Sequence, residues 1–513
     1  MEKKVRVRFA PSPTGALHIG GIRTALYNYI FARQQGGEMI LRIEDTDQAR
    51  LIPGAEDYIF EALEWIGIQP DEGVKQGGVH SPYRQSERKE IYREYVMQLI
   101  EAKHAYYAFD TPEELEAMRE RLKAAGVVTP QYNAIARTTM KNSLTLPPEE
   151  VKARIDAGEP YVIRLKVPRK EEIRLNDMIR GWVMVHSSTL DDKVLLKSDG
   201  MPTYHLANVV DDHLMGITHV IRGEEWLPSA PTHVLLYRFF GWEDTMPQFA
   251  HLPLLLKPDG NGKLSKRDSQ KHGFPIFPIT WTDEDGATLI GFREAGYLPD
   301  ALINFLVFLG WNPGTEQELF TLDELIQNFS IERVHKAGVK FDIDKAQWYN
   351  QQYIKSKPDE ELTAYLLPQL EKEGIQADKD KVIKVCELLK ERVTFTQDFW
   401  LQGQYFFVAP EHYAPEIVQK KWTEEAVKAL TAYSKELQNA TEALTAEQAK
   451  SILQEVLEDL DIKMGKIMPA LRLAITGVGG GPDLMEIISV IGRKETTQRI
   501  ENAIKRLAVY VKV

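Results

Sequence analysis

The order of local patterns in the first 70 residues is the feature that most limits the fold of this chain. Apolar residues alternate with arginines over 5–9, which predicts a strand with one buried face. A helical pattern over 20–35 then ends at Gly36-Gly37, a common C-terminal stop. A second alternating stretch, 39–43, and a second helical stretch, 54–66, follow. This order predicts an α/β fold of the Rossmann type, with a parallel, doubly wound sheet.

The pattern changes twice further along the chain. Residues 106–187 are charged and rich in helix formers, and they predict an inserted α+β lobe with one short strand at 161–167. The α/β pattern resumes at Val194, and beyond Asp342 the chain is almost wholly helical. Five regions are therefore expected: a first catalytic half (1–105), the inserted lobe (106–187), a second catalytic half (188–262), a loop and stem-contact region (263–345) and an all-α C-terminal region (346–513).

The composition excludes several classes of protein. A net charge of −12 argues against a general nucleic-acid binder, although it permits a local basic groove. The one cysteine, Cys386, excludes an intrachain disulfide and a cysteine-rich zinc cluster. There is neither an uninterrupted apolar run of about 18 residues nor an apolar segment near the N-terminus, so we expect no membrane span, no secretory signal and a cytoplasmic location.

The strongest motif joins the first strand to the first helix. It reads Ala10-Pro11-Ser12-Pro13-Thr14-Gly15-Ala16-Leu17-His18-Ile19-Gly20-Gly21. In doubly wound folds this junction lies at the carboxyl end of the sheet, where ligands bind. The glycines would let a ligand approach the backbone, and the helix N-terminus would offer free N–H groups to phosphate. The structural alternative is a turn whose histidine is satisfied locally.

A second motif is a basic loop, Lys263-Leu264-Ser265-Lys266-Arg267, which follows the glycine-containing stretch 259–262. Two lysines and an arginine on a flexible loop could close over a polyphosphate and stabilise charge that develops during attack. By itself such a run could equally be a solvated basic turn.

Together the two strings resemble the HIGH and KMSKS signatures of class I aminoacyl-tRNA synthetases, with Gly21 in place of the final histidine of HIGH. The wider context resembles the glutamyl-tRNA synthetase family. The matching blocks, in chain order, are 8–15, 42–47, 82–88, 195–200, 202–212 and 222–226. The resemblance is dense to about residue 270 and looser to the C-terminus.

The resemblance implies a reaction in two steps, with ATP as a substrate and Mg²⁺ on its phosphates. Glutamate attacks the α-phosphate to give glutamyl-adenylate, and the 3′-terminal adenosine of tRNA(Glu) then takes the glutamyl group. Catalysis would be positioning plus charge stabilisation. It implies His18, Lys263 and Lys266 as catalytic residues. The ATP site would contain these three together with Gly20, Gly21, Glu225 and Ser265.

The resemblance also implies a glutamate pocket, with Glu44 as the partner of the ammonium and Arg222 as the partner of the side-chain carboxylate. An arginine left unpaired would penalise glutamine. The positions that match the family are Arg8, Ala10, Ser12, Glu44, Tyr204, Asn208 and Arg222. Taken singly, Arg8 could be a strand-face charge, Glu44 a surface ion-pair member and Tyr204 a core residue.

The helical C-terminus resembles the family's anticodon-binding domains. The implied tRNA contacts are Asp47, Trp226 and Arg392, and a monomer is the family expectation. Asp211-Asp212 is interpreted as a capping or ion-pair feature rather than a metal site. With one cysteine, the zinc cluster of some family members is not expected, and the segment 268–287 has no assigned role.

Four other functions were weighed. A glutaminyl-tRNA synthetase is disfavoured by Arg222, and the truncated relative that glutamylates a modified tRNA base is disfavoured by the long helical C-terminus. A nucleotidyltransferase of the same superfamily would have little use for that region. A non-catalytic tRNA-binding paralogue is disfavoured because His18, Lys263 and Lys266 are all present. Whether a glutamate-specific enzyme would also charge glutamine-accepting tRNA is left open, as is the need for bound tRNA during activation.

Overall fold

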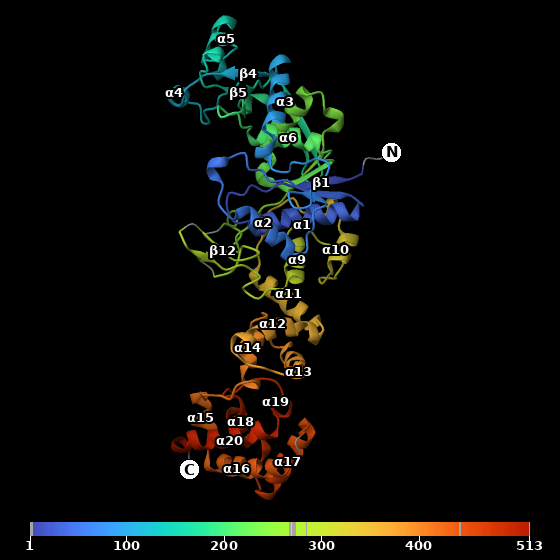
Figure 1. Cartoon of the computed structure of the whole chain (residues 1–513), viewed down its shortest axis with the longest axis vertical. Helices are drawn as coiled ribbons and strands as arrows, with labels where there is room; N and C mark the ends of the chain where they lie inside the picture. Colours follow the sequence, from blue (N-terminus) through green and yellow to red (C-terminus); the bar gives the residue numbers. More distant parts are fainter. Residues whose placement is uncertain (1–3, 266–267, 269–272, 284, 441–442, 512–513) are drawn as a thin grey trace. The chain divides into compact units, whose positions relative to one another are not determined.

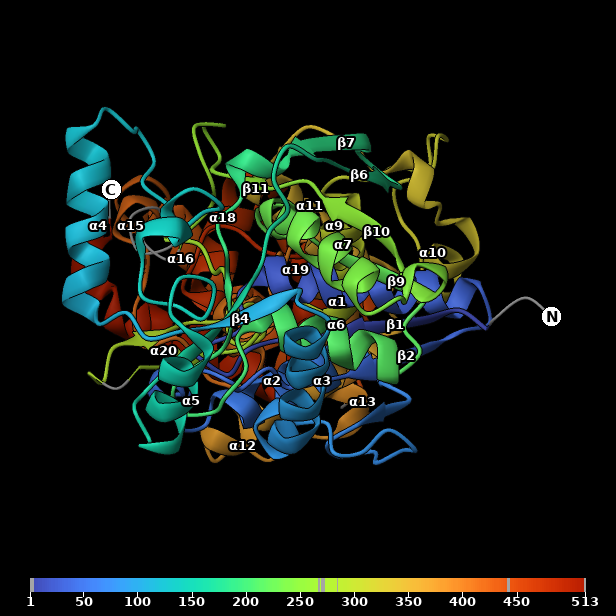
Figure 2. The same cartoon turned by 90° about the horizontal axis from the view of Figure 1, so that it is seen from above.

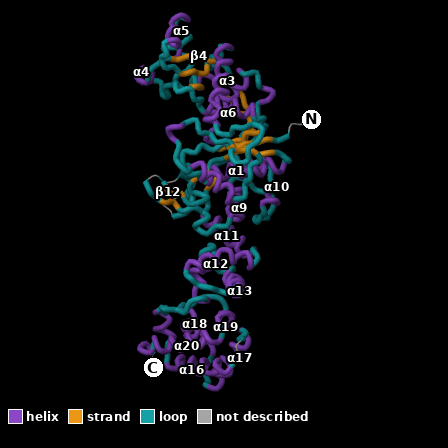
Figure 3. The backbone as a smooth tube through the Cα atoms, viewed as in Figure 1, coloured by secondary structure: helices purple, strands orange, loops and turns teal. Residues whose placement is uncertain are grey.

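The computed structural model describes residues 4–265, 268, 273–283, 285–440 and 443–511, and it divides the chain into two compact units (Figure 1). Unit 1 contains residues 1–294 and 299–343, and unit 2 contains 295–298 and 344–513. Figure 3 shows that, among the described residues, strands are confined to unit 1 while unit 2 is helical.

A parallel arrangement of strands forms the centre of unit 1, as predicted. The first sheet has the order β1 (Arg6–Phe9), β2 (Glu38–Leu41) and β3 (Glu72–Gly73), with parallel pairing throughout. The second sheet has the order β7 (Gly181–His186), β6 (Glu172–Asp177), β10 (Gln248–Leu252) and β9 (His219–Gly223). The N–H of Thr218, just before β9, donates to the Arg6 carbonyl at 2.8 Å, so β9 lies beside β1.

Helices cover both faces of these strands. Figure 1 shows α3 and α6 on one side of β1 and α1 on the other, and in the view from above these helices overlap (Figure 2). The five helices that surround the sheets are α1 (Ile19–Gln34), α2 (Ala55–Trp65), α3 (Lys89–Glu101), α6 (Tyr204–Leu214) and α7 (Ala230–Phe239). The sequence patterns over 20–35 and 54–66 predicted α1 and α2 to within one residue at each end, because both helices carry long buried stripes.

The inserted region contains more strands than the single one predicted. β4 (Ala105–Ala108), β5 (Val162–Leu165) and β8 (Val194–Leu196) form an antiparallel sheet, and α4 (Pro112–Ala124) and α5 (Pro148–Asp156) lie in the same region. A separate small core is built around Tyr106, Met118 and Tyr132.

Two details of that region correct the sequence-based expectation. β8, which we took as the return of the α/β pattern, pairs with β5 instead of the parallel sheet. The β6–β7 hairpin lies within the predicted lobe, yet β6 pairs with β10 in parallel. Both strands of the hairpin alternate in burial, so the period-2 pattern was present in the sequence, but the charged stretch around it was interpreted as mainly helical.

The remaining elements of unit 1 precede the helical region. They are the strands β11 (Leu255–Leu256) and β14 (Val339–Lys340), the hairpin of β12 (Trp281–Thr282) and β13 (Thr288–Leu289), and the helices α9 (Pro299–Phe308) and α10 (Leu322–Asn328). β12 falls in the segment 268–287, which had no predicted role, and β13 follows directly after it.

Unit 2 is all-α over its described residues, as expected. Its helices are α11 (Ile343–Ser356), α12 (Asp359–Lys372), α13 (Lys379–Leu389), α14 (Asp398–Gly403), α15 (Pro415–Lys421), α16 (Glu424–Asn439), α17 (Ala446–Asp459), α18 (Met464–Thr476), α19 (Leu484–Ile491) and α20 (Arg493–Arg506). A search of the described residues finds no helix with the length and apolar character needed to span a membrane.

Candidate active site

A cavity of about 830 Å³ opens where β1 and β9 end and α1 begins. Its volume is within the range of small-molecule sites, and its position is the one expected for a ligand in a doubly wound fold. Of the residues predicted from the sequence, those that line it are Arg8, Ala10, Ser12, His18, Gly20, Gly21, Glu44, Asp47, Tyr204, Asn208, Arg222, Glu225 and Trp226.

The basic loop is placed differently. Lys263 does not line the cavity, but its Nζ lies 3.1 Å from Oε1 of Glu225, which does. Ser265 is also outside the lining, and its N–H and hydroxyl donate to the Asp268 carboxylate at 2.9 and 2.5 Å. Lys266, the third predicted catalytic residue, lies outside the described residues.

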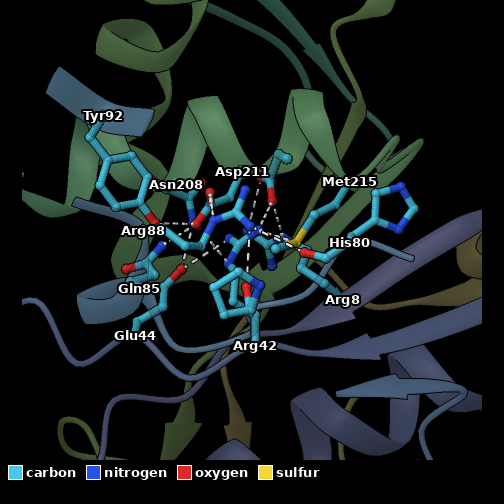
Figure 4. A network of polar contacts seen from close by, with 12 residues as sticks. Arg8, Arg42, Glu44, His80, Gln85, Arg88, Tyr92, Asn208, Asp211 and Met215 are labelled. Carbon is cyan, nitrogen blue, oxygen red and sulfur yellow. Dashed lines mark hydrogen bonds and ion pairs between the residues drawn. The ribbon is translucent and has the colours of Figure 1, made fainter. Parts of the chain in front are cut away.

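A buried network of charges lies behind the cavity, and two of its members, Arg8 and Glu44, line it (Figure 4). Arg42 is fully buried and donates to Oε1 of Glu44 at 3.0 Å and to Oδ1 of Asp212 at 2.8 Å. Arg8 donates to Asp212 at 3.1 Å, and Arg88 donates to Asp211 at 2.8 Å. Three arginines therefore meet three carboxylates, which makes burial of these charges tolerable. The ion-pair interpretation of Asp211-Asp212 is confirmed.

The network sets the protonation of its carboxylates. Burial alone would raise the pKa of Asp212, but Arg8 and Arg42 hold it below its usual range, so Asp212 is an anion. Burial raises the pKa of Glu44 above its usual range, against the opposing effect of Arg42, Arg8 and Asn208. An incoming cation would favour the ionised form of Glu44.

Glu44 keeps one oxygen for a ligand. Its Oε1 accepts from Arg42 and from Nδ2 of Asn208, each at 3.0 Å, whereas no described residue donates to its Oε2. Tyr204, Asn208 and Asp212 follow one another at the i, i+4, i+8 spacing, which places them on one face of α6. An ammonium group that reached Oε2 would meet a carboxylate already fixed by two donors.

Arg222 has a different environment from Arg8. It is only 4% exposed, and its guanidinium donates from Nε to Nε2 of His251 at 3.0 Å and from Nη1 to the Tyr204 hydroxyl at 2.7 Å. Nη2 donates to the Trp226 carbonyl at 3.3 Å. All these partners are neutral, and no described carboxylate forms an ion pair with Arg222. A buried, unpaired guanidinium at the cavity wall is a binding site for an anionic group.

The N-terminus of α1 corrects one prediction. We expected free N–H groups there, but the first helical N–H groups are occupied: that of Ile19 donates to the Ile276 carbonyl at 3.0 Å, that of Gly20 to Nδ1 of His18 at 3.1 Å, and that of Gly21 to the His18 carbonyl at 2.7 Å. Sequence patterns do not show which distant carbonyl reaches a helix end. The positive end of the helix dipole still favours phosphate at this point, and His18 lines the cavity there.

The segment that had no assigned role supports this motif. Phe277 is 1% exposed, and its ring meets that of His18 edge-on, with 6.2 Å between centroids. The Tyr58 hydroxyl of α2 donates to the Ile279 carbonyl at 2.6 Å. Residues 276–279 of this segment therefore contact both α1 and α2, and Phe277 helps to position the His18 ring.

Sequence reasoning missed several residues of the site. Lys197 lines the cavity and donates to the Thr46 carbonyl at 3.0 Å, although it lies in a block that we quoted without a role. Arg42 organises the network, and His251 holds Arg222. The detectable signal for His251 was a single histidine within the otherwise apolar run 249–256.

Unit 2 contains a second cavity of about 710 Å³, lined by Arg392 together with Tyr405, His412 and the glycine pair Gly480-Gly481. The Tyr405 hydroxyl is buried without a hydrogen-bond partner. A cation, an aromatic ring and exposed backbone in one cavity can receive an unstacked nucleobase.

Comparisons with known proteins agree with this geometry. Residues 4–348 match the family model for tRNA synthetases class I (E and Q), catalytic domain, and residues 361–504 match the model for an anticodon binding domain. A glutamate–tRNA ligase of Cytophaga hutchinsonii is 65% identical over 507 residues, which span 99% of this chain and 98% of that protein. One of Amoebophilus asiaticus is 61% identical and spans 98% of this chain and 99% of that protein. The crystal structure of a glutamate tRNA ligase from Elizabethkingia meningosepticum, in complex with its amino acid, matches with a TM-score of 0.94 at 49% identity and covers 98% of this chain and 100% of that chain.

Proposed function

Since this chain belongs to the glutamate–tRNA ligases, within the class I aminoacyl-tRNA synthetases, we propose that its cavity binds glutamate through Arg222 and activates it with ATP. The observation that carries the proposal is the buried guanidinium of Arg222, which lines the cavity and pairs with no described carboxylate. The side-chain carboxylate of glutamate supplies the missing charge. Glutamine would leave the guanidinium unpaired, which is a penalty for the wrong substrate.

The other ends of glutamate are assigned by charge. Glu44 takes the ammonium through its Oε2, and Asn208 keeps the Glu44 carboxylate in place. Arg8 lies toward the α-carboxylate, and its charge is moderated by Asp212. Tyr204 holds Arg222, while Ala10 and Ser12 shape the wall beside them.

We assign ATP to the end of the cavity at α1. His18 stabilises charge on the phosphates, and Gly20 and Gly21 leave room for the nucleotide. Lys263, Ser265 and Lys266 belong to a loop that would close over the phosphates. Glu225 holds Lys263 at the cavity edge before ATP arrives. Mg²⁺ would be held by the phosphates, because the described residues contain no group of three His, Cys, Asp or Glu able to hold a metal.

The tRNA would contact both units. Asp47 and Trp226, at the rim of the first cavity, are assigned to its 3′ end, and Arg392, in the second cavity, to an anticodon base. Arginine reads a base edge bidentately, which favours this role. We further propose that the protein acts as a cytoplasmic monomer.

Aminoacylation with labelled glutamate and ATP tests the proposal, using purified tRNA(Glu) and tRNA(Gln) in parallel. Charging of tRNA(Glu) alone would establish a discriminating ligase, and charging of both would keep the active-site assignment while making anticodon recognition permissive. Charging of neither would refute the proposal.

A further inference from the structure

We propose that His251 and Asp177 form a positioning relay that fixes the guanidinium of Arg222 for the side-chain carboxylate of the substrate. The inference rests on the proposed glutamate-binding role of Arg222. Neither relay residue lines the cavity, so both act through Arg222.

Sheet topology brings the three residues together. Asp177, His251 and Arg222 lie on β6, β10 and β9, which are neighbours in the order β6-β10-β9. His251 is directly opposite Arg222 in the parallel ladder. His251 is fully buried, and Asp177 is 2% exposed.

The contacts define the direction of each hydrogen bond. Nδ1 of His251 lies 2.6 Å from Oδ2 of Asp177, and the His251 Nε2 accepts from Arg222 Nε at 3.0 Å. A carboxylate only accepts, so Nδ1 carries the ring proton and Nε2 presents a lone pair. The other carboxylate oxygen, Oδ1, accepts from the N–H groups of Ile179 and Arg180 at 2.9 and 2.8 Å, which locks the Asp177 side chain.

This arrangement satisfies Arg222 without neutralising it. A carboxylate in direct contact would form a bidentate pair with the guanidinium and compete with the substrate. The interposed imidazole takes only the Nε–H and keeps the negative charge of Asp177 one residue away. Burial lowers the pKa of His251 despite the opposing effect of Asp177, and Arg222 acts in the same direction as burial, which favours the neutral ring that accepts from Arg222.

The variant Asp177→Asn tests the relay by reversing the tautomer. The two backbone N–H groups require the amide oxygen at the Oδ1 position, so the amide NH₂ faces His251 Nδ1 and donates to it. The ring proton then moves to Nε2, where it opposes the Nε–H of Arg222. An asparagine in place of the aspartate of a catalytic triad disables the histidine in the same way.

We expect the KM for glutamate in tRNA(Glu) aminoacylation to rise about 10- to 100-fold, because a misplacement of about 1 Å at a positioning group costs up to about 100-fold. The kcat and the KM for ATP should stay within about twofold. Asp378→Asn is the matched control, since Asp378 also accepts two backbone N–H groups through one oxygen but forms no hydrogen bond or ion pair with a described histidine. Thermal melting of each variant establishes that it is folded.

A second background separates the relay from simple packing. His251→Gln keeps an acceptor for Arg222 and has no tautomer, so Asp177→Asn should have little effect in that background. Nitrogen-15 shifts of labelled histidine should show the proton on Nδ1 in the native protein and on Nε2 in Asp177→Asn. An unchanged KM in Asp177→Asn, equal effects in both backgrounds, or an unchanged tautomer would each overturn the relay. If Arg222→Ala abolishes the preference for glutamate over glutamine while Asp177→Asn leaves the KM for glutamate unchanged, only the relay is wrong. If Arg222→Ala leaves that preference intact, the proposed role of Arg222 is wrong as well.

Discussion

Replacement of Arg222 by alanine is the most direct perturbation of the proposed specificity. The side chain is 4% exposed at the cavity wall and has four neutral partners, which are His251, Tyr204, His233 and the Trp226 carbonyl. In the complex with glutamate, its charge would be balanced by the substrate. After Arg222→Ala, the substrate carboxylate would be buried without a counter-charge.

The expected size of the effect follows from the burial. Removal of one partner of a buried ion pair costs about 3–5 kcal/mol, which corresponds to a loss of roughly 150- to 5,000-fold in kcat/KM for glutamate. The side-chain amide of glutamine is neutral and needs no counter-charge, so kcat/KM for glutamine should change by less than about threefold. The preference for glutamate over glutamine should therefore narrow by about two to three orders of magnitude.

Steady-state aminoacylation of tRNA(Glu) with each amino acid measures kcat/KM for glutamate and for glutamine. Arg174→Ala is a matched control, because Arg174 is 63% exposed and pairs with Glu172 on the surface, where such pairs contribute at most about 1 kcal/mol. Melting temperatures separate loss of binding from loss of fold. The reasoning is refuted if kcat/KM for glutamate falls by less than about threefold, or if kcat/KM falls by the same factor for glutamate and for glutamine.

Three further results are expected. Phe277→Leu should keep the fold but slow ATP–pyrophosphate exchange, because it loosens the ring of His18; an exchange rate equal to that of the native protein at an equal melting temperature would contradict this. Although burial acts the other way, hydrogen bonds from Tyr83 and its neighbours lower the pKa of Glu72 to about 2, so its stabilisation is present above the unfolded pKa of 4.5 and is lost as the pH falls toward 2. In Glu72→Gln, the midpoint of urea unfolding should therefore depend less on pH across that interval. If the midpoint depends on pH as steeply as in the native protein, the role assigned to Glu72 is wrong. Arg392→Ala should raise the KM for tRNA about 5- to 150-fold and leave the KM for glutamate unchanged; an unaltered KM for tRNA would exclude Arg392 from the anticodon site.

Much of the fold could be read from local patterns. Period-2 alternation in β1 and β2 and helical stripes in α1 and α2 are properties of short segments. In each segment, the spacing of the apolar residues indicates which face is buried. The prediction failed for β6, whose alternating pattern lies within a charged stretch interpreted as mainly helical, and for β8, which pairs with β5.

The candidate site, like the fold, was predicted from the sequence only in part. Thirteen of the residues predicted from motifs line one cavity. The motifs identified these residues without indicating where they lie relative to one another. Spacing on α6 already placed Tyr204 and Asn208 on one face. What each side chain contacts was not available from those motifs.

The sequence by itself determined the fold class, the family and the chemical inventory of the site, because those depend on local periodicity and on short strings of residues. Only the tertiary structure decided how the charges are balanced. Asp212 forms an ion pair with Arg8 across 204 residues of sequence, whereas Arg222 meets a neutral His251 and has no described carboxylate partner. Likewise, the Ile276 carbonyl occupies an N–H of α1 that the sequence had suggested was free. The physical reason is that hydrogen bonds and ion pairs are made between neighbours in space, and parallel strands bring together residues that are far apart in the chain.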